Sequence, residues 1–221
     1  MGKKKEIIRL VIGFLGSMLG CFGVISFNQY LLMSLPLVVR MVLMIVVYWL
    51  IALIPIIIVL YDKTPLSYFG FKKEGKSRQI GIGVLLGLAM SFIFTLLPHF
   101  LGYGDYVDTG TRYQFAWQFI YEFVWCILAV GAVEEFVFRG FLYEKSKKIF
   151  KTDIAAIILS SVLFGMFHIF HGDVGQIVLT GFIGAIFCLC RKYIKNCSTL
   201  SLIMAHGIYD ALITVWANCL Q

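Results

Sequence analysis

Long runs of apolar residues follow one another along nearly the whole chain. They cover residues 7–27, 37–61, 80–101, 113–138, 154–170, 175–193 and 200–219. A run of about 20 residues crosses the hydrocarbon core of a bilayer as an α-helix, which satisfies its own backbone polar groups in lipid. The sequence therefore predicts an all-α fold, a polytopic transmembrane bundle of about seven helices.

The composition agrees with a membrane location. Of the 221 residues 60% are hydrophobic and 14% are charged, whereas soluble domains are only about half apolar. Because the apolar runs extend from end to end, we expect one transmembrane domain over residues 1–221 and no separate soluble domain. The first run continues past Cys21, so it predicts a retained first helix rather than a cleaved signal peptide.

Basic residues give the chain a formal net charge of +7, and their positions indicate an orientation. Nearly all of them fall within residues 3–9, 63–78, 139–151 and 191–195. Lys and Arg accumulate in cytoplasmic loops, so the pattern predicts a cytoplasmic N-terminus and gives no reason to expect nucleic acid as a partner. Residues 143–148 are expected to form the solvated, basic end of the fourth helix.

Several ionisable residues lie within the apolar runs. They are Glu122, Glu134, Glu135, Arg139, His168, His206 and Asp210. A charged group at bilayer depth costs several kcal/mol, so such residues pair, face a wet cavity or carry function. Glu122 is expected only to pair with a polar group of a neighbouring helix.

The spacing of these residues suggests separate roles. Glu135 and Arg139 are four apart, so they share a helix face and can form an ion pair. Glu134 projects about 100° away on an α-helix and is expected to be left free for acid–base chemistry. His206 and Asp210 are also four apart, so the carboxylate can orient the imidazole or bind the same group.

His168 is a third candidate for the same site. Phe164 lies one turn before it, where its ring would shield the histidine from lipid. Counted along the helices from the flanking basic residues, Glu134, His168 and His206 all lie well inside the bilayer, so they could meet near the midplane. A carboxylate and two imidazoles can activate water and stabilise an oxyanion. The same residues with Asp210 could instead bind a divalent metal such as zinc.

Three motifs stand in order along the second half of the chain. They are Glu134-Glu135-Phe136-Val137-Phe138-Arg139, Phe164-Gly165-Met166-Phe167-His168 and His206-Gly207-Ile208-Tyr209-Asp210. This pattern resembles the CPBP (Abi) family of CAAX prenyl proteases and bacteriocin-processing or self-immunity proteins, whose motifs are E-E-x-x-x-R, F-x-x-x-H and H-x-x-x-N or D. The resemblance covers a motif-bearing core, residues 113–221, whereas the first half is similar only in being helical.

The resemblance implies an intramembrane endopeptidase. Glu134 and His168 would activate the attacking water, while His206 and Asp210 would stabilise the oxyanion or bind a metal. Glu135, Arg139 and Phe164 are expected to support the site. The cofactor would be a divalent metal, or none in a glutamate-dependent mechanism. We expect a hydrophobic or lipid-tethered peptide as substrate, in a bacterial cell membrane, with a role in bacteriocin or signal-peptide maturation or in self-immunity.

The residues also allow two other interpretations of the function. A non-catalytic immunity or scaffold protein could bind a bacteriocin or receptor through the same bundle. Gly102-Tyr103-Gly104-Asp105 and Tyr209-Asp210 match strings of intramembrane aspartyl proteases, but in reversed order and with Asp105 in a polar loop. The sequence does not give the substrate, the cleavage site or the oligomeric state.

Overall fold

The structure is a computed structural model, and it describes residues 2–104, 112–170 and 174–220. Throughout these residues the secondary structure is helical, without a strand. Helices long and apolar enough to cross a membrane are Lys3–Ser34, Leu37–Tyr61, Lys76–Tyr103, Ala116–Phe150, Asp153–Phe170, Val174–Tyr193 and Thr199–Cys219. The predicted all-α fold and the number of spans are confirmed.

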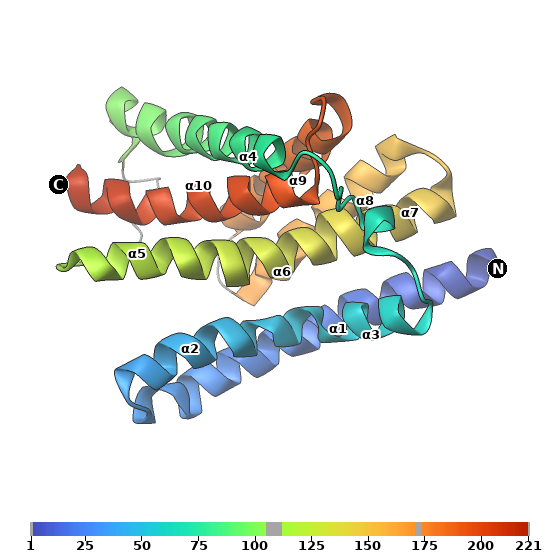
Figure 1. The fold of residues 1–221 in the computed structure, drawn as a ribbon, viewed down its shortest axis with the longest axis horizontal. Coiled ribbons are helices and arrows are strands. Elements are labelled where there is room, and N and C mark those ends of the chain that lie inside the picture. The colour runs from blue at the N-terminus through green and yellow to red at the C-terminus, as the bar shows by residue number, and fades with distance from the viewer. Residues whose placement is uncertain (1, 105–111, 171–173, 221) are drawn as a thin grey trace. The chain divides into compact units, whose positions relative to one another are not determined.

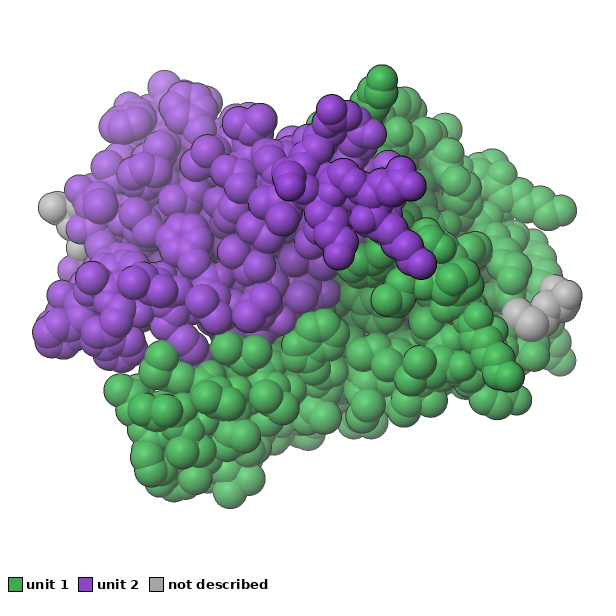
Figure 2. All heavy atoms as spheres, in the orientation of Figure 1, with its two compact units in different colours: residues 1–71, 133–195 green, residues 72–132, 196–221 purple. Residues whose placement is uncertain are grey.

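The chain divides into two compact units, coloured separately in Figure 2. The first comprises residues 1–71 and 133–195, and the second comprises residues 72–132 and 196–221. The fourth span contributes to both, because residue 133 lies within it.

The first unit begins with a long helix that lies against a helical segment returning beside it (Figure 1). Its elements are α1 (Lys3–Tyr30), η1 (Leu32–Ser34), α2 (Leu37–Tyr48), η2 (Trp49–Ala52), α3 (Leu53–Tyr61), η3 (Leu66–Phe69), η8 (Glu135–Leu142), α7 (Tyr143–Phe150), α8 (Asp153–Phe167), η9 (His168–Phe170) and α9 (Val174–Tyr193). The short helix α6 (Ala132–Glu134) precedes η8.

Glycines allow α1 to approach the returning segment closely. A Cβ on Gly20 would lie 2.4 Å from the carbonyl oxygen of Leu50, and one on Gly16 would lie 2.5 Å from Cβ of Ile54. Without a hydrophobic driving force in lipid, the close packing that small residues allow holds transmembrane helices together.

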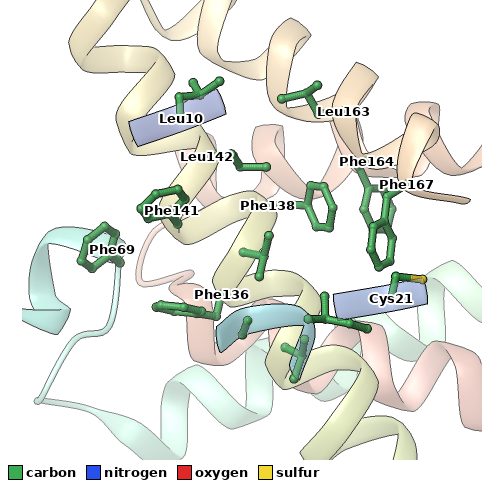
Figure 3. Close-up of a cluster of buried hydrophobic side chains, with 14 of the residues drawn as sticks. Leu10, Cys21, Phe69, Phe136, Phe138, Phe141, Leu142, Leu163, Phe164 and Phe167 are labelled. Carbon is green, nitrogen blue, oxygen red and sulfur yellow. The ribbon is translucent and has the colours of Figure 1, made fainter. Parts of the chain in front are cut away.

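Aromatic side chains from η8 and α8 form the core of the first unit, shown in Figure 3. Phe138 makes tilted or edge contacts with Phe164 and Phe167, at ring-centroid distances of 5.0 and 5.2 Å. Such pairs contribute about 0.5–1.5 kcal/mol each beyond their buried area. The core therefore holds the first two motifs against each other.

The end of the fourth span differs from the prediction. Residues 143–148 belong to α7 and are not simply a solvated end, because Lys145 is only 3% exposed. Its ammonium lies 3.0 Å from Glu6 and 3.3 Å from Asp62, which also accepts a hydrogen bond from Arg9. A buried lysine needs such partners, and these stand more than 80 residues away in the sequence.

The second unit is built around its C-terminal helix. Its elements are α4 (Lys76–Ser91), the π-helical segments η4 (Phe92–Leu96) and η5 (His99–Tyr103), α5 (Ala116–Trp125), the π-helical η7 (Cys126–Gly131) and α10 (Thr199–Cys219). α10 lies beside α4 (Figure 1). The close approach depends on Gly83 and Gly87, since a Cβ on either would come within 3 Å of α10.

Candidate active site

The two carboxylates of the first motif lie where the helix changes from α to π geometry. Glu134 ends α6 and Glu135 begins η8, whose residues are π-helical. The side chains are 2% and 0% exposed. Turns of π-helix are rare in proteins, but those that occur are often at functional sites. Buried carboxylates need specific partners.

Glu135 forms the ion pair predicted from its spacing. Its carboxylate lies 3.0 Å from Nη1 of Arg139, and both side chains are almost fully buried. The guanidinium also lies over the ring of Phe164, 3.9 Å from its centroid, and over that of Phe187 at 5.3 Å. Cation–π contacts strengthen when they are removed from water. This cluster joins η8 to α8 and α9.

Phe164 and His168 interact as the second motif predicts. The rings meet edge to face with centroids 4.8 Å apart, and Nδ1 of His168 lies 2.9 Å from the carbonyl oxygen of Phe164. A carbonyl only accepts hydrogen bonds, so Nδ1 carries the proton in this contact. In the neutral ring the lone pair is then on Nε2, the nitrogen that can accept a proton or bind a metal.

Glu134 is not left free, contrary to the prediction. The hydroxyl of Tyr48 donates a hydrogen bond of 2.5 Å to its Oε1. The two residues are 86 positions apart, so helical spacing gave no indication of the contact. A tyrosine near the middle of the apolar run 37–61 is the signal that could have found it, since tyrosines normally lie at the ends of transmembrane helices.

The third motif lies on α10 in the second unit. Nε2 of His206 lies 3.3 Å from Oδ2 of Asp210, as their spacing predicts. The backbone around His206 is packed tightly, because a Cβ on Gly207 would lie 2.6 Å from Cα of Ile127 in η7. The part of α10 that carries His206 is therefore packed closely against η7.

The candidate residues thus fall into two groups. Glu134 and His168 belong to the first unit, whereas His206 and Asp210 belong to the second. A catalytic zinc site takes three protein ligands, and neither unit, in its described part, brings together three His, Cys, Asp or Glu side chains that could hold a metal. The expectation of one shared site, with or without a metal, stays a prediction.

Two further sequence candidates have different outcomes. Glu122 pairs with polar groups as expected, since it accepts hydrogen bonds from Tyr113 at 2.7 Å and from Thr214 on α10 at 3.2 Å. This contact ties the start of the fourth span to α10. Asp105, the residue required by the aspartyl-protease reading, lies outside the described residues.

Comparison with known proteins adds one match. Residues 115–212 match the family described as type II CAAX prenyl endopeptidase Rce1-like. That family is the CPBP (Abi) family, and the match covers less than half of the chain. The matched residues contain all three motifs, so the resemblance drawn from the motifs is confirmed. The match supports a CAAX-type intramembrane endopeptidase. No curated protein and no solved structure matches the chain.

Proposed function

We propose that this protein hydrolyses a peptide bond in a hydrophobic or lipid-tethered peptide at membrane depth, with Glu134 as the base. The observation that carries the proposal is the carboxylate of Glu134, which is buried and accepts a hydrogen bond from Tyr48. Glu134 lies within the residues that match the Rce1-like family. A buried, oriented carboxylate is suited to accept a proton from water.

The reaction needs only groups of this chain and one water molecule. Glu134 takes a proton from the water, whose oxygen attacks the scissile carbonyl carbon. Nε2 of His168 accepts a hydrogen bond from the other O–H group of the water and so orients the water. The tetrahedral intermediate collapses when the C–N bond breaks, and the proton passes from Glu134 to the leaving nitrogen. The products are a carboxylic acid and an amine, the acid passes its remaining proton to the amine to give a carboxylate and an ammonium group, and Glu134 is ionised again.

His206 is assigned to the oxyanion. Nε2 of His206 faces Asp210, 3.3 Å away, and a protonated imidazole beside this carboxylate can stabilise the developing negative charge. Preorganised donors of this kind typically contribute a factor of about 10²–10³ to the rate. Asp210 orients the ring, as a carboxylate beside a functional histidine commonly does.

The proposal is tested in cells that produce wild type or Glu134→Gln at equal levels. Peptides of the membrane and the medium are compared by mass spectrometry. We expect one or more hydrophobic peptides to be trimmed by wild type alone. The sequence of the trimmed peptide would identify the substrate and show whether the protein acts in peptide maturation or in self-immunity. Glu122→Gln is the matched control, because it removes another carboxylate within the spans but leaves the motifs intact, and it should retain trimming.

Identical peptides in wild type and Glu134→Gln cells would contradict the proposal. If Glu134→Gln also protected cells against a bacteriocin as well as wild type does, the protein would act by binding, as an immunity or scaffold protein would. Loss of trimming in Glu122→Gln at normal protein levels would show that trimming depends on carboxylates within the spans in general, rather than on the motif.

A further inference from the structure

Tyr48 lies at an unusual depth for a tyrosine. It is near the middle of the span Leu37–Tyr61, whereas Tyr30, Tyr61 and Tyr193 lie near the ends of their spans and are 72% to 79% exposed. Tyrosine favours the membrane interface, where its ring is in lipid and its hydroxyl in water. A phenol at mid-span needs a hydrogen-bond acceptor inside the protein, and Tyr48 finds Glu134.

The helix that carries Tyr48 changes its geometry at this position. α2 ends at Tyr48, and the next four residues, η2, form a tighter 3₁₀ turn before α3 continues the span. Pro55 follows this turn, and a proline lacks the N–H group and clashes with the carbonyl four residues earlier. The backbone is also held by α1, because only a glycine at position 20 fits against Leu50. Tyr48 therefore extends from a fixed part of the chain.

The contact with Glu134 is short enough to orient the carboxylate. The oxygen–oxygen distance is 2.5 Å, within the range of hydrogen bonds between a hydroxyl and an ionised carboxylate. Because Oε1 is held by the phenol, rotation of the carboxylate about its last side-chain bond is restricted. A base must be held within a few tenths of an ångström of its working position, and a displacement of about 1 Å can cost 10²-fold in rate.

We infer that Tyr48 is a positioning residue for the proposed peptidase: its hydroxyl holds the carboxylate of Glu134 in the orientation that removes a proton from the attacking water. The inference rests on the proposed function. Tyr48 acts through Glu134 and is not assigned any contact with substrate.

The test compares the kinetics of purified wild type, Tyr48→Phe, Tyr61→Phe and Glu134→Gln on a farnesylated, fluorogenic peptide with an apolar C-terminal tail. We expect Tyr48→Phe to lower kcat by about 10- to 100-fold while KM changes by less than about threefold, because a positioning contact acts on the chemical step. Tyr61→Phe changes an exposed tyrosine of the same span and should behave like wild type.

A second measurement separates positioning from a general loss of structure and needs no substrate. The infrared difference spectrum between wild type and Glu134→Gln isolates the carboxyl bands of Glu134. The same difference taken in the Tyr48→Phe background should show these bands shifted, because a hydrogen bond to Oε1 has been removed. Thermal unfolding of the variants checks that Tyr48→Phe is folded at the assay temperature.

The outcomes distinguish failure of the positioning role of Tyr48 from failure of the proposed function. If Glu134→Gln is inactive while Tyr48→Phe matches wild type, or if the bands do not shift, the positioning role is wrong and the proposed function is unaffected. If wild type cleaves no better than Glu134→Gln, the proposed function fails with this peptide, and the infrared bands alone decide whether Tyr48 holds Glu134.

Discussion

Several charged side chains are buried inside this protein, and they lie beside partners that offset their charge. The pair formed by Glu135 and Arg139 is among the most buried, and the guanidinium is further covered by the rings of Phe164 and Phe187. Removing two charges from water costs several kcal/mol for each ion, and the attraction between them recovers much of that cost only while both are present. The pair is therefore expected to matter for structure more than for chemistry.

Replacing one member of this pair should be costly. We expect Arg139→Met to lower the free energy of unfolding by about 3–5 kcal/mol, because it leaves the carboxylate of Glu135 buried without its partner. The double variant with Glu135→Leu should recover part of the loss. The measurement is an unfolding titration with SDS in mixed micelles.

The matched control for this pair is Lys147→Met on the next helix. Lys147 pairs with Asp153 at 2.8 Å, but its side chain is 49% exposed, and exposed pairs contribute less than about 1 kcal/mol. Equal destabilisation by Lys147→Met and Arg139→Met would mean that burial does not determine the strength of these pairs.

Packing between helices depends on glycines in both units. In the second unit α10 meets η7 at Gly207, where an added Cβ would lie 2.6 Å from Cα of Ile127 and 2.7 Å from the carbonyl oxygen of Cys126. These atoms belong to the backbone and cannot turn aside as the end of a side chain can. Since Gly207 follows His206, the same contact fixes the position of the third motif.

A methyl group at this contact should therefore separate the helices. We expect Gly207→Ala to lower the unfolding free energy by about 1–3 kcal/mol, the usual cost of overpacking, and to reduce peptide cleavage. Gly81→Ala in α4 is the control, because nothing lies within 4 Å of its added Cβ and alanine favours a helix by up to about 1 kcal/mol. A stable Gly207→Ala variant would show that α10 is not held against η7 in this way.

Contacts within one turn of helix were predictable from the sequence, but contacts between distant segments were not. The pairing of Glu135 with Arg139 and of His206 with Asp210 follows from a spacing of four residues, and both contacts are present. The partner of Glu134 and the partners of Lys145 come from other helices. Helical periodicity carries no information about which faces meet, so it predicts neither set of partners, and only the mid-span position of Tyr48 gave a signal for the first.

The chain as a whole is predicted to cross the membrane an odd number of times. Seven helices long and apolar enough to span it lie in the described residues, and the basic segments predict that the N-terminus is cytoplasmic. We expect an epitope tag at the C-terminus to be accessible to antibody on intact spheroplasts, and a tag at the N-terminus to be accessible only after permeabilisation. Two termini on the same side would require a different number of spans.

The order of the elements places each motif on a helix, but the sequence could not show how the helices are grouped. The first two motifs share the aromatic core of the first unit, and the third lies in the second unit. The match of residues 115–212 to the Rce1-like family includes segments of both.

Hydrolysis by Glu134 can be measured with purified protein in water enriched in ¹⁸O. Wild type should cut the farnesylated peptide and place one ¹⁸O atom in the new carboxylate, which mass spectrometry detects as a gain of about two mass units. Glu134→Gln should give neither cleavage nor label, whereas Glu122→Gln should give both. Unlabelled cleavage by wild type, or labelled cleavage by Glu134→Gln at the wild-type rate, would contradict the assignment of Glu134 as the base.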